Sequence, residues 1–186
     1  NIYSQCKLTK RDETMKKFVI LPMFLIALAG CDDTRLTVTT DTGPNVVRHA
    51  LPNNSTFPIS RAVEVSPGTT LIYHSGQLPS PANPDAERGT REYTGDTEHQ
   101  AMTVLKKFEK SFESLGVGFE DVIKMTVFLV GDPELDGRMD FGGFMKSYSK
   151  FFGTEEQPNK PARSAVQINA LAGGWLIEIE MVLAKP

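Results

Sequence analysis

The sequence has few cysteines and lacks the common signatures of catalytic and nucleotide-binding sites. Its 186 residues include two cysteines, Cys6 and Cys31, and both precede the part that has the pattern of a folded domain. That domain therefore has no disulfide, no thiol nucleophile and no cysteine-based metal site. The patterns G-x-G-x-x-G, the P-loop, H-E-x-x-H and G-x-S-x-G are all missing. Nucleotide binding, zinc-protease chemistry and a serine nucleophile elbow therefore have no support.

Histidine is also scarce, and positive charge is concentrated at one end of the chain. The three histidines, His49, His74 and His99, are far apart and show no metal-ligand spacing. Residues 1–30 hold five of the 20 lysines and arginines and two of the 23 aspartates and glutamates, so residues 31–186 carry 15 − 21 = −6. An acidic body lacks the usual electrostatic footprint for nucleic acid. We expect no metal, no organic cofactor and no nucleic-acid partner.

The first long apolar run has the layout of a secretory signal. Two lysines follow Met15, residues 18–29 are mostly apolar, and residues 28–31 read LAGC. The run is too short to span a bilayer as a mature helix but suits a signal peptide. Its lysines, apolar run, small residues and cysteine stand in the order of the bacterial lipobox. This order disfavours the alternatives, which are a buried helix or a plain signal peptide that ends near a cysteine by chance.

These features predict that residues 15–30 form a lipoprotein signal peptide and that Cys31 is the acylated residue. The protein would then be exported and anchored to a membrane, more firmly by several acyl chains than by one. Asp32 resembles an inner-membrane retention signal, so we expect the periplasmic face of the inner membrane. Residues 1–14 are polar, and we interpret them as upstream sequence without a structural role.

The rest of the chain divides into a tether and one domain. Residues 31–57 are rich in Thr, Asp, Asn and Pro without sustained periodicity, which predicts a flexible tether. Residues 58–186 show alternating strand and helix patterns over a length that suits one domain.

The hydrophobic periodicity of this domain predicts an α+β fold of order ββαβαββ. In chain order we expect strands at 61–65 and 69–74 joined as a hairpin, a helix at 97–115, a strand at 122–130, a helix from 132 to 152, and strands at 163–169 and 175–183. Asp96 or Thr97 suits the start of the first helix, and Gly116 suits its end. We interpret the aromatic stripe of the second helix as core packing. The two helices should cover one face of a mixed or antiparallel sheet.

Three segments of the domain resemble the RidA (YjgF-type) family. Residues 74–79, HSGQLP, match the end of a family strand, and residues 121–129, DVIKMTVFL, match its central strand. Residues 161–164, PARS, followed by 176–180, LIEIE, match its terminal pair of strands. Each motif is weak alone, but all three occur in family order and at family spacing over about residues 58–186.

This resemblance implies a chorismate-mutase-like fold, a homotrimer with ligand pockets between subunits, and hydrolysis of reactive imines. It implies that Arg163 binds the substrate carboxylate and that Glu178 positions or activates a water molecule. The substrate-binding positions that it implies are Ser75, Gly76, Ala165, Ile59 and Met145.

The residue types suit this chemistry, although simpler interpretations exist. An arginine presents a planar fork that binds a carboxylate through two parallel hydrogen bonds, and a glutamate can accept a proton from water. Without its motif, Arg163 would be an ordinary surface residue at a strand end. Glu178 and Glu180 alternate with isoleucines, which is typical of a sheet with one solvated face. The resemblance selects Glu178 and leaves Glu180 as a surface residue or a supporting one.

Two positions depart from the family pattern. Family members commonly carry a tyrosine where this chain has Ile59, and often an asparagine where it has Met145. The resemblance therefore implies an unusually apolar pocket. The leading hypothesis is a hydrolase similar to 2-iminobutanoate and 2-iminopropanoate deaminases, which releases 2-oxo acids and ammonia. The alternative is a non-catalytic trimeric module that binds small carboxylates. An RNA-cleaving translation inhibitor fits poorly with export and an acidic body.

Overall fold

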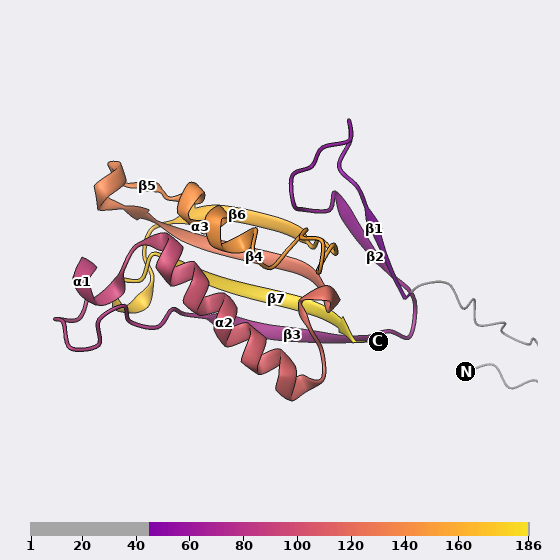
Figure 1. The fold of residues 1–186 in the computed structure, drawn as a ribbon, viewed down its shortest axis with the longest axis horizontal. Coiled ribbons are helices and arrows are strands. Elements are labelled where there is room, and N and C mark those ends of the chain that lie inside the picture. The colour runs from indigo at the N-terminus through magenta and orange to yellow at the C-terminus, as the bar shows by residue number, and fades with distance from the viewer. Residues whose placement is uncertain (1–44, 186) are drawn as a thin grey trace, which may run out of the picture. The chain divides into compact units, whose positions relative to one another are not determined.

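The computed structural model describes residues 45–185, and Figure 1 labels its elements. The strands are β1 (Val46–His49), β2 (Ala62–Val65), β3 (Thr70–Gln77), β4 (Val122–Asp132), β5 (Arg138–Met139), β6 (Ala162–Ile168) and β7 (Ile177–Lys185). The helices are α1 (Arg91–Thr94), α2 (Thr97–Leu115) and α3 (Phe141–Tyr148), and the 3-10 turns are η1 (Phe119–Asp121), η2 (Pro133–Leu135) and η3 (Ala172–Gly174).

The main sheet is mixed. Strand β7 pairs antiparallel with β3 on one side and with β4 on the other, and β6 lies parallel to β4. The short β5 pairs with the end of β4. In Figure 1, α2 and α3 lie on the same face of this sheet. The predicted α+β fold, with two helices on one face of a mixed sheet, is therefore confirmed.

The core fills the space between this sheet and the two helices. Along β7 every second side chain faces the helices and is at most 1% exposed: Ile177, Ile179, Met181 and Leu183. The apolar side of α2 is equally buried and consists of Ala101, Val104, Leu105, Phe108 and Phe112. Each large side chain buried in this way contributes roughly 1.5–3 kcal/mol to stability. The periods of two and 3.6 residues in the sequence thus identify the buried faces correctly.

Helix α2 begins and ends as its sequence predicts. The carboxylate of Asp96 accepts a hydrogen bond from the backbone N–H of His99 at 2.8 Å, which satisfies a free donor of the first turn. Gly116 ends the helix in the left-handed conformation with φ of 67°, which a side chain would disfavour.

The predicted hairpin of residues 61–65 and 69–74 is wrong. Strand β2 pairs with β1 in a separate two-stranded sheet, whereas β3 pairs with β7. The turn at Gly68, with φ of 85°, carries the chain from the small sheet to the main one instead of folding it back. Strand β1 lies inside the segment expected to be a tether, so this part of residues 31–57 is regular structure.

The second helix starts later than expected. Pro133 begins the 3-10 turn η2, and α3 starts only at Phe141. Asp136 and Gly137 lie between them with positive φ, a conformation that an α-helix cannot contain. Asp140 then caps α3 by accepting a hydrogen bond from the N–H of Gly143 at 2.8 Å. Within residues 45–185, none of the helices has the length and apolar character needed to cross a membrane.

Candidate functional site

Arg163 lies near the start of β6 and points toward the helix side of the sheet. Its guanidinium carbon is 4.2 Å from the ring centre of Tyr148 and 5.0 Å from that of Phe144, both on α3. The rings of Phe57 and Phe141 lie at 5.4 and 5.6 Å. Contacts between a cation and ring faces at these distances are attractive, and more so away from water. The four rings form an aromatic cage, defined by Phe57, Phe141, Phe144 and Tyr148, around one positive charge.

The guanidinium lacks an acidic partner in the described part of the chain. None of the ion pairs found there includes Arg163, and its Nη1 instead donates to the sulfur of Met145 at 3.3 Å. Burial lowers the pKa of Arg163, although the neighbouring Tyr148 opposes this effect. A thioether sulfur is a weak hydrogen-bond acceptor, so this half-buried guanidinium can still bind a stronger acceptor, such as a carboxylate.

The ring of Tyr148 is held in place by its own hydroxyl group. This hydroxyl donates to the carbonyl oxygen of Pro58 at 2.6 Å, and the ring is fully buried. Burial raises the pKa of Tyr148 above its ordinary value, so the hydroxyl stays a donor. The hydrogen bond also ties the segment next to Phe57 to helix α3, and thereby positions one wall of the cage.

Glu178 lies on β7 between two buried isoleucines, so its side chain points to the face of the sheet that the helices leave open. Its carboxylate packs directly on Gly76 at the end of β3, where an added Cβ would collide with Glu178 Oε1. The Glu178 carboxylate can hold this position only because residue 76 has no side chain, and any Cβ there would force the carboxylate to move.

The structure thus places the two predicted catalytic residues on opposite faces of the sheet. Arg163 pairs with Met125 of β4, whose side chain is buried on the helix side. Glu178 pairs with Phe128, three residues further along β4 and on the other face. One chain does not bring their side chains together.

The remaining predicted positions lie in three places. Met145 contacts Arg163, and Ala165 follows on the same face of β6, packed against the core. Ser75 lies next to Gly76 and borders a hollow of about 230 Å³ on the open face, which Glu180 also lines. Ile59 lines a different hollow of about 260 Å³ together with Arg48, Ser60 and Lys160. Cys31 lies outside the described residues.

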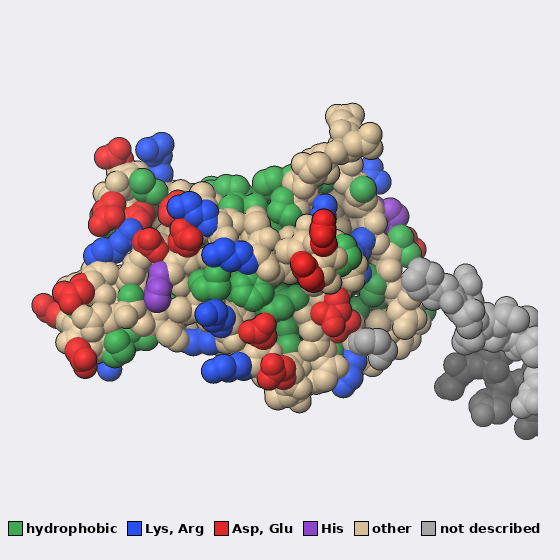
Figure 2. All heavy atoms as spheres, in the orientation of Figure 1, with side chains coloured by type: hydrophobic (Ala, Val, Ile, Leu, Met, Phe, Trp, Pro, Cys, Tyr) green, Lys and Arg blue, Asp and Glu red, His purple; other side chains and the backbone are tan. Residues whose placement is uncertain are grey.

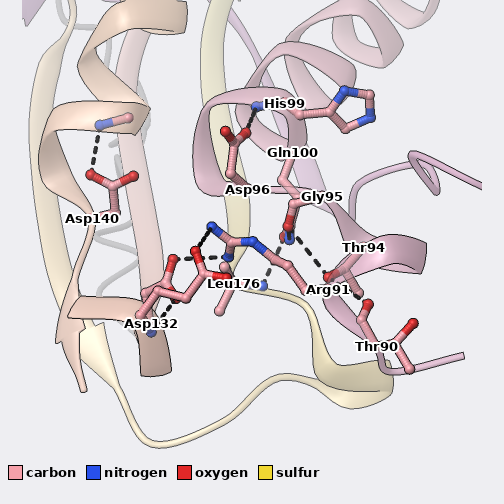
Figure 3. A network of polar contacts seen from close by, with 12 residues as sticks. Thr90, Arg91, Thr94, Gly95, Asp96, His99, Gln100, Asp132, Asp140 and Leu176 are labelled. Carbon is pink, nitrogen blue, oxygen red and sulfur yellow. Dashed lines mark hydrogen bonds and ion pairs between the residues drawn. The ribbon is translucent and has the colours of Figure 1, made fainter. Parts of the chain in front are cut away.

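A polar network holds Leu176, the residue before the start of β7 (Figure 3). The N–H of Leu176 donates to the side-chain oxygen of the fully buried Gln100 at 2.8 Å, and the amide nitrogen of Gln100 donates to the carbonyl of Gly95 at 3.1 Å. Close by, Arg91 forms a 2.9 Å ion pair with Asp132, whose side chain is 2% exposed. These contacts join α1, α2 and the ends of β4 and β7.

Sequence reasoning missed the aromatic cage. Its α3 members were expected to be core residues, and Phe144 and Tyr148 are indeed fully buried. They also face Arg163, and the spacing of residues 141, 144 and 148 on one helix side was the available signal. Phe57 carried no signal, because it lies in a segment without periodicity.

Comparisons with known proteins agree with this fold. The sequence model of the Endoribonuclease L-PSP family matches residues 47–185, so all of the small sheet except its first residue lies in the matched region. A RutC family protein of Pyrococcus abyssi is 33% identical over 128 residues, which cover 69% of this chain and 87% of the relative. TdcF of Escherichia coli, a candidate reactive intermediate deaminase, is 30% identical over 116 residues, which cover 62% of this chain and 80% of that protein.

Among solved structures, YyfB of Yersinia pestis, a Rid protein of unknown function, superimposes with a TM-score of 0.57 at 22% identity. The match covers 76% of this chain and 100% of YyfB, and identity at this level shows the shared fold alone. Since the family sequence model spans most of the chain, and the relatives are matched over most of their own lengths, the protein belongs to the Rid family, also called YjgF or L-PSP.

Proposed function

We propose that this protein hydrolyses 2-imino acids to 2-oxo acids and ammonia. The observation that carries the proposal is the guanidinium of Arg163, half-buried among aromatic rings and without a carboxylate partner in residues 45–185. A charge in such surroundings is stabilised by an incoming anion, and its planar fork fits a carboxylate. A 2-imino acid carries that carboxylate beside the C=N carbon that water attacks.

Glu178 supplies the proton transfers that this hydrolysis needs. A water molecule gives a proton to the Glu178 carboxylate as its oxygen bonds to the imine carbon. The protonated glutamate then gives this proton to the nitrogen of the adduct. As the C–N bond breaks and the C=O bond forms, the carboxylate takes the hydroxyl proton and passes it to the departing ammonia. The iminium form of the substrate and water become the 2-oxo acid and ammonium, and no electron acceptor takes part.

This chemistry requires Arg163 of one copy to meet Glu178 of another, and we propose a homotrimer with its pockets between subunits. Within the described residues, β6 pairs with β4 along one edge, and on its other edge only Ala162 at its start forms a bridge, with Ser60. A strand edge that is otherwise free is normally covered. The open face also exposes large side chains, with Tyr73 at 77% and Val166 at 43%. Association of copies would cover both features.

We further propose that the protein is exported and anchored through Cys31 at the periplasmic face of the inner membrane, as residues 15–31 indicate. A radioactive fatty acid should label the wild type during growth, and Cys31→Ala should abolish the label. Cys6→Ala is the matched control and should keep it. Equal labelling of the Cys31→Ala chain would contradict the anchor.

A binding module that catalyses little is the second candidate function. The contact between Met145 and Arg163 favours it, because a thioether sulfur offers a reacting imine only weak hydrogen bonding. RNA cleavage is not proposed, although the family's description includes it. Residues 31–186 carry a net −6, and acidic and basic side chains are interspersed on the face that Figure 2 shows, whereas RNA-binding surfaces gather positive charge.

An imine-trapping assay tests the proposed reaction. An amino-acid oxidase generates the imine in situ, semicarbazide traps it, and an active hydrolase lowers the trapped fraction. Arg163→Ala should lower kcat/KM by about 30- to 1000-fold, since it removes a bidentate charged contact, and Arg163→Lys should recover little. Glu178→Gln should lower kcat by about 10²–10⁴. Glu180→Gln and Arg61→Ala, both at exposed positions, are controls. Wild-type protein that never competes with the trap would favour the binding module.

A further inference from the structure

We infer that the preferred substrates are 2-imino acids with an apolar side chain of the size of leucine, methionine or phenylalanine, selected by Met145, Phe57 and Phe141. This inference rests on the proposed function and adds the class of substrate. It follows from the groups that surround Arg163, the cation proposed to hold the substrate carboxylate.

Met145 is the first constraint on the substrate. Its sulfur lies 3.3 Å from Nη1 of Arg163. A carboxylate oxygen bonded to the same guanidinium would lie about 2.8 Å from its nitrogen. The carboxylate and the atoms next to it are therefore within contact distance of the Met145 side chain. A flexible thioether adapts to apolar groups of different shapes.

The aromatic cage extends this apolar surface. Phe144 and Tyr148 are fully buried and support the guanidinium from within, so their rings are not available to a ligand. Phe57 is 39% exposed and Phe141 and Met145 are half-buried, so these three side chains present apolar surface to a bound molecule.

The same surroundings disfavour polar side chains. The hydroxyl of Tyr148 donates to the carbonyl of Pro58. The other cage side chains carry no hydrogen-bonding group, and the neighbouring Met145 offers only a weak sulfur acceptor. A hydroxyl or amide on the substrate would lose water there without gaining a partner. An apolar pocket distinguishes substrates that differ by a methylene by roughly 10- to 200-fold, so leucine and alanine derivatives should be clearly resolved.

The test compares imines made from leucine, methionine and phenylalanine with those from alanine and glutamine, in the semicarbazide assay with the full-length chain. We expect kcat/KM at least about tenfold higher for the first group. Met145→Asn should reduce this ratio severalfold by placing an amide beside Arg163, and Phe57→Ala should reduce it without changing the preference for carboxylates. Met145→Leu keeps an apolar side chain, and Lys146→Ala alters the exposed neighbour on α3, so both controls should keep the ratio.

Calorimetry separates failure of this inference from failure of the proposed reaction. We expect the wild type to bind 4-methyl-2-oxopentanoate at least about tenfold more tightly than pyruvate. Hydrolysis of all the imines at similar kcat/KM would overturn the substrate class and leave the reaction intact. If no imine is hydrolysed, the proposed reaction is wrong, and calorimetry then tests the apolar site alone. Tighter binding of 4-methyl-2-oxopentanoate than of pyruvate would support that site. Equal binding of the two acids, or no binding, would overturn it.

Discussion

The guanidinium of Arg163 and the carboxylate of Glu178 leave the same sheet on opposite faces. Strand β4 separates their strands, and Glu178 is level with Phe128 while Arg163 is level with Met125. The two strands are separated by two strand spacings, which is about 10 Å. Because the two side chains also point to opposite faces of the sheet, their charged groups lie still farther apart. If both side chains serve one reaction, each belongs to a different copy of the chain.

Mixed assemblies test this arrangement directly. Arg163→Ala and Glu178→Gln chains should each be nearly inactive alone. Coexpressed, they should form trimers in which about one interfacial pocket in four, on random assembly, combines an intact Arg163 with an intact Glu178. Two different affinity tags, purified in sequence, isolate the mixed species for the imine assay.

The control is a mixture of Arg163→Ala chains that carry the two tags, which should stay inactive. Mixed species that also stay inactive would mean that the two residues do not share a pocket between copies. Sedimentation of the same samples reports whether they are trimers.

Gly76 should affect the catalytic rate because the absence of a side chain there leaves room for the carboxylate of Glu178. A methyl group at residue 76 collides with the Glu178 carboxylate, so Gly76→Ala should displace that group by about the size of a methyl. We expect kcat to fall by roughly 10- to 1000-fold with a smaller change in KM, because misplaced catalytic groups lose near-attack geometry. In a Glu178→Gln background the same change should cost much less. Additive losses in the double variant would place the effect of Gly76 elsewhere.

Regular patterns made most of the fold predictable. The apolar spacing of α2, together with Asp96 and Gly116, predicts the observed helix and both of its ends. Strands β4, β6 and β7 also lie where β-branched or alternating residues predict them. The pairing of β2 was not predictable, because short strands carry little information about their partners, and the true partner β1 lay in a segment without periodicity.

The sequence predicted only part of the candidate site. The motifs identified Arg163 and Glu178, but the faces to which they point depend on the register of three strands. A one-residue difference in register would reverse a face. The cage residue Phe57 is more than 100 positions from Arg163 in the sequence, and its contact exists only because the chain folds back near Pro58.

Tyr148 should make the protein less stable at alkaline pH. Burial raises the pKa of its hydroxyl in the folded state, whereas the unfolded chain releases that proton near pH 10. Above that pH the unfolded state binds fewer protons than the folded state. The free energy of unfolding therefore falls as pH rises, by up to about 1.4 kcal/mol per pH unit from this group.

Urea unfolding between pH 8 and 11 measures the effect. Tyr148→Phe should be less stable at neutral pH, because it loses the hydrogen bond to Pro58, but its stability should fall less steeply above pH 10. Tyr73→Phe is the control, since Tyr73 is 77% exposed. Parallel pH profiles for wild type and Tyr148→Phe would contradict the assignment.

Replacing Gln100 should lower both the free energy of unfolding and kcat, because its side chain binds the N–H of Leu176, two residues before Glu178. Gln100→Leu keeps much of the volume but leaves the buried N–H of Leu176 without its partner, at a cost of about 1–3 kcal/mol. The carbonyl of Gly95 loses one donor and keeps the hydroxyl of Thr94. The free energy of unfolding in urea should fall by this order, and kcat should fall more than KM changes. Glu109→Gln, on the exposed side of α2, should alter neither quantity. If the Gln100 amide holds β7 in place, its removal must lower the free energy of unfolding. A Gln100→Leu protein that unfolds at the wild-type urea concentration would therefore show that other contacts fix the start of β7.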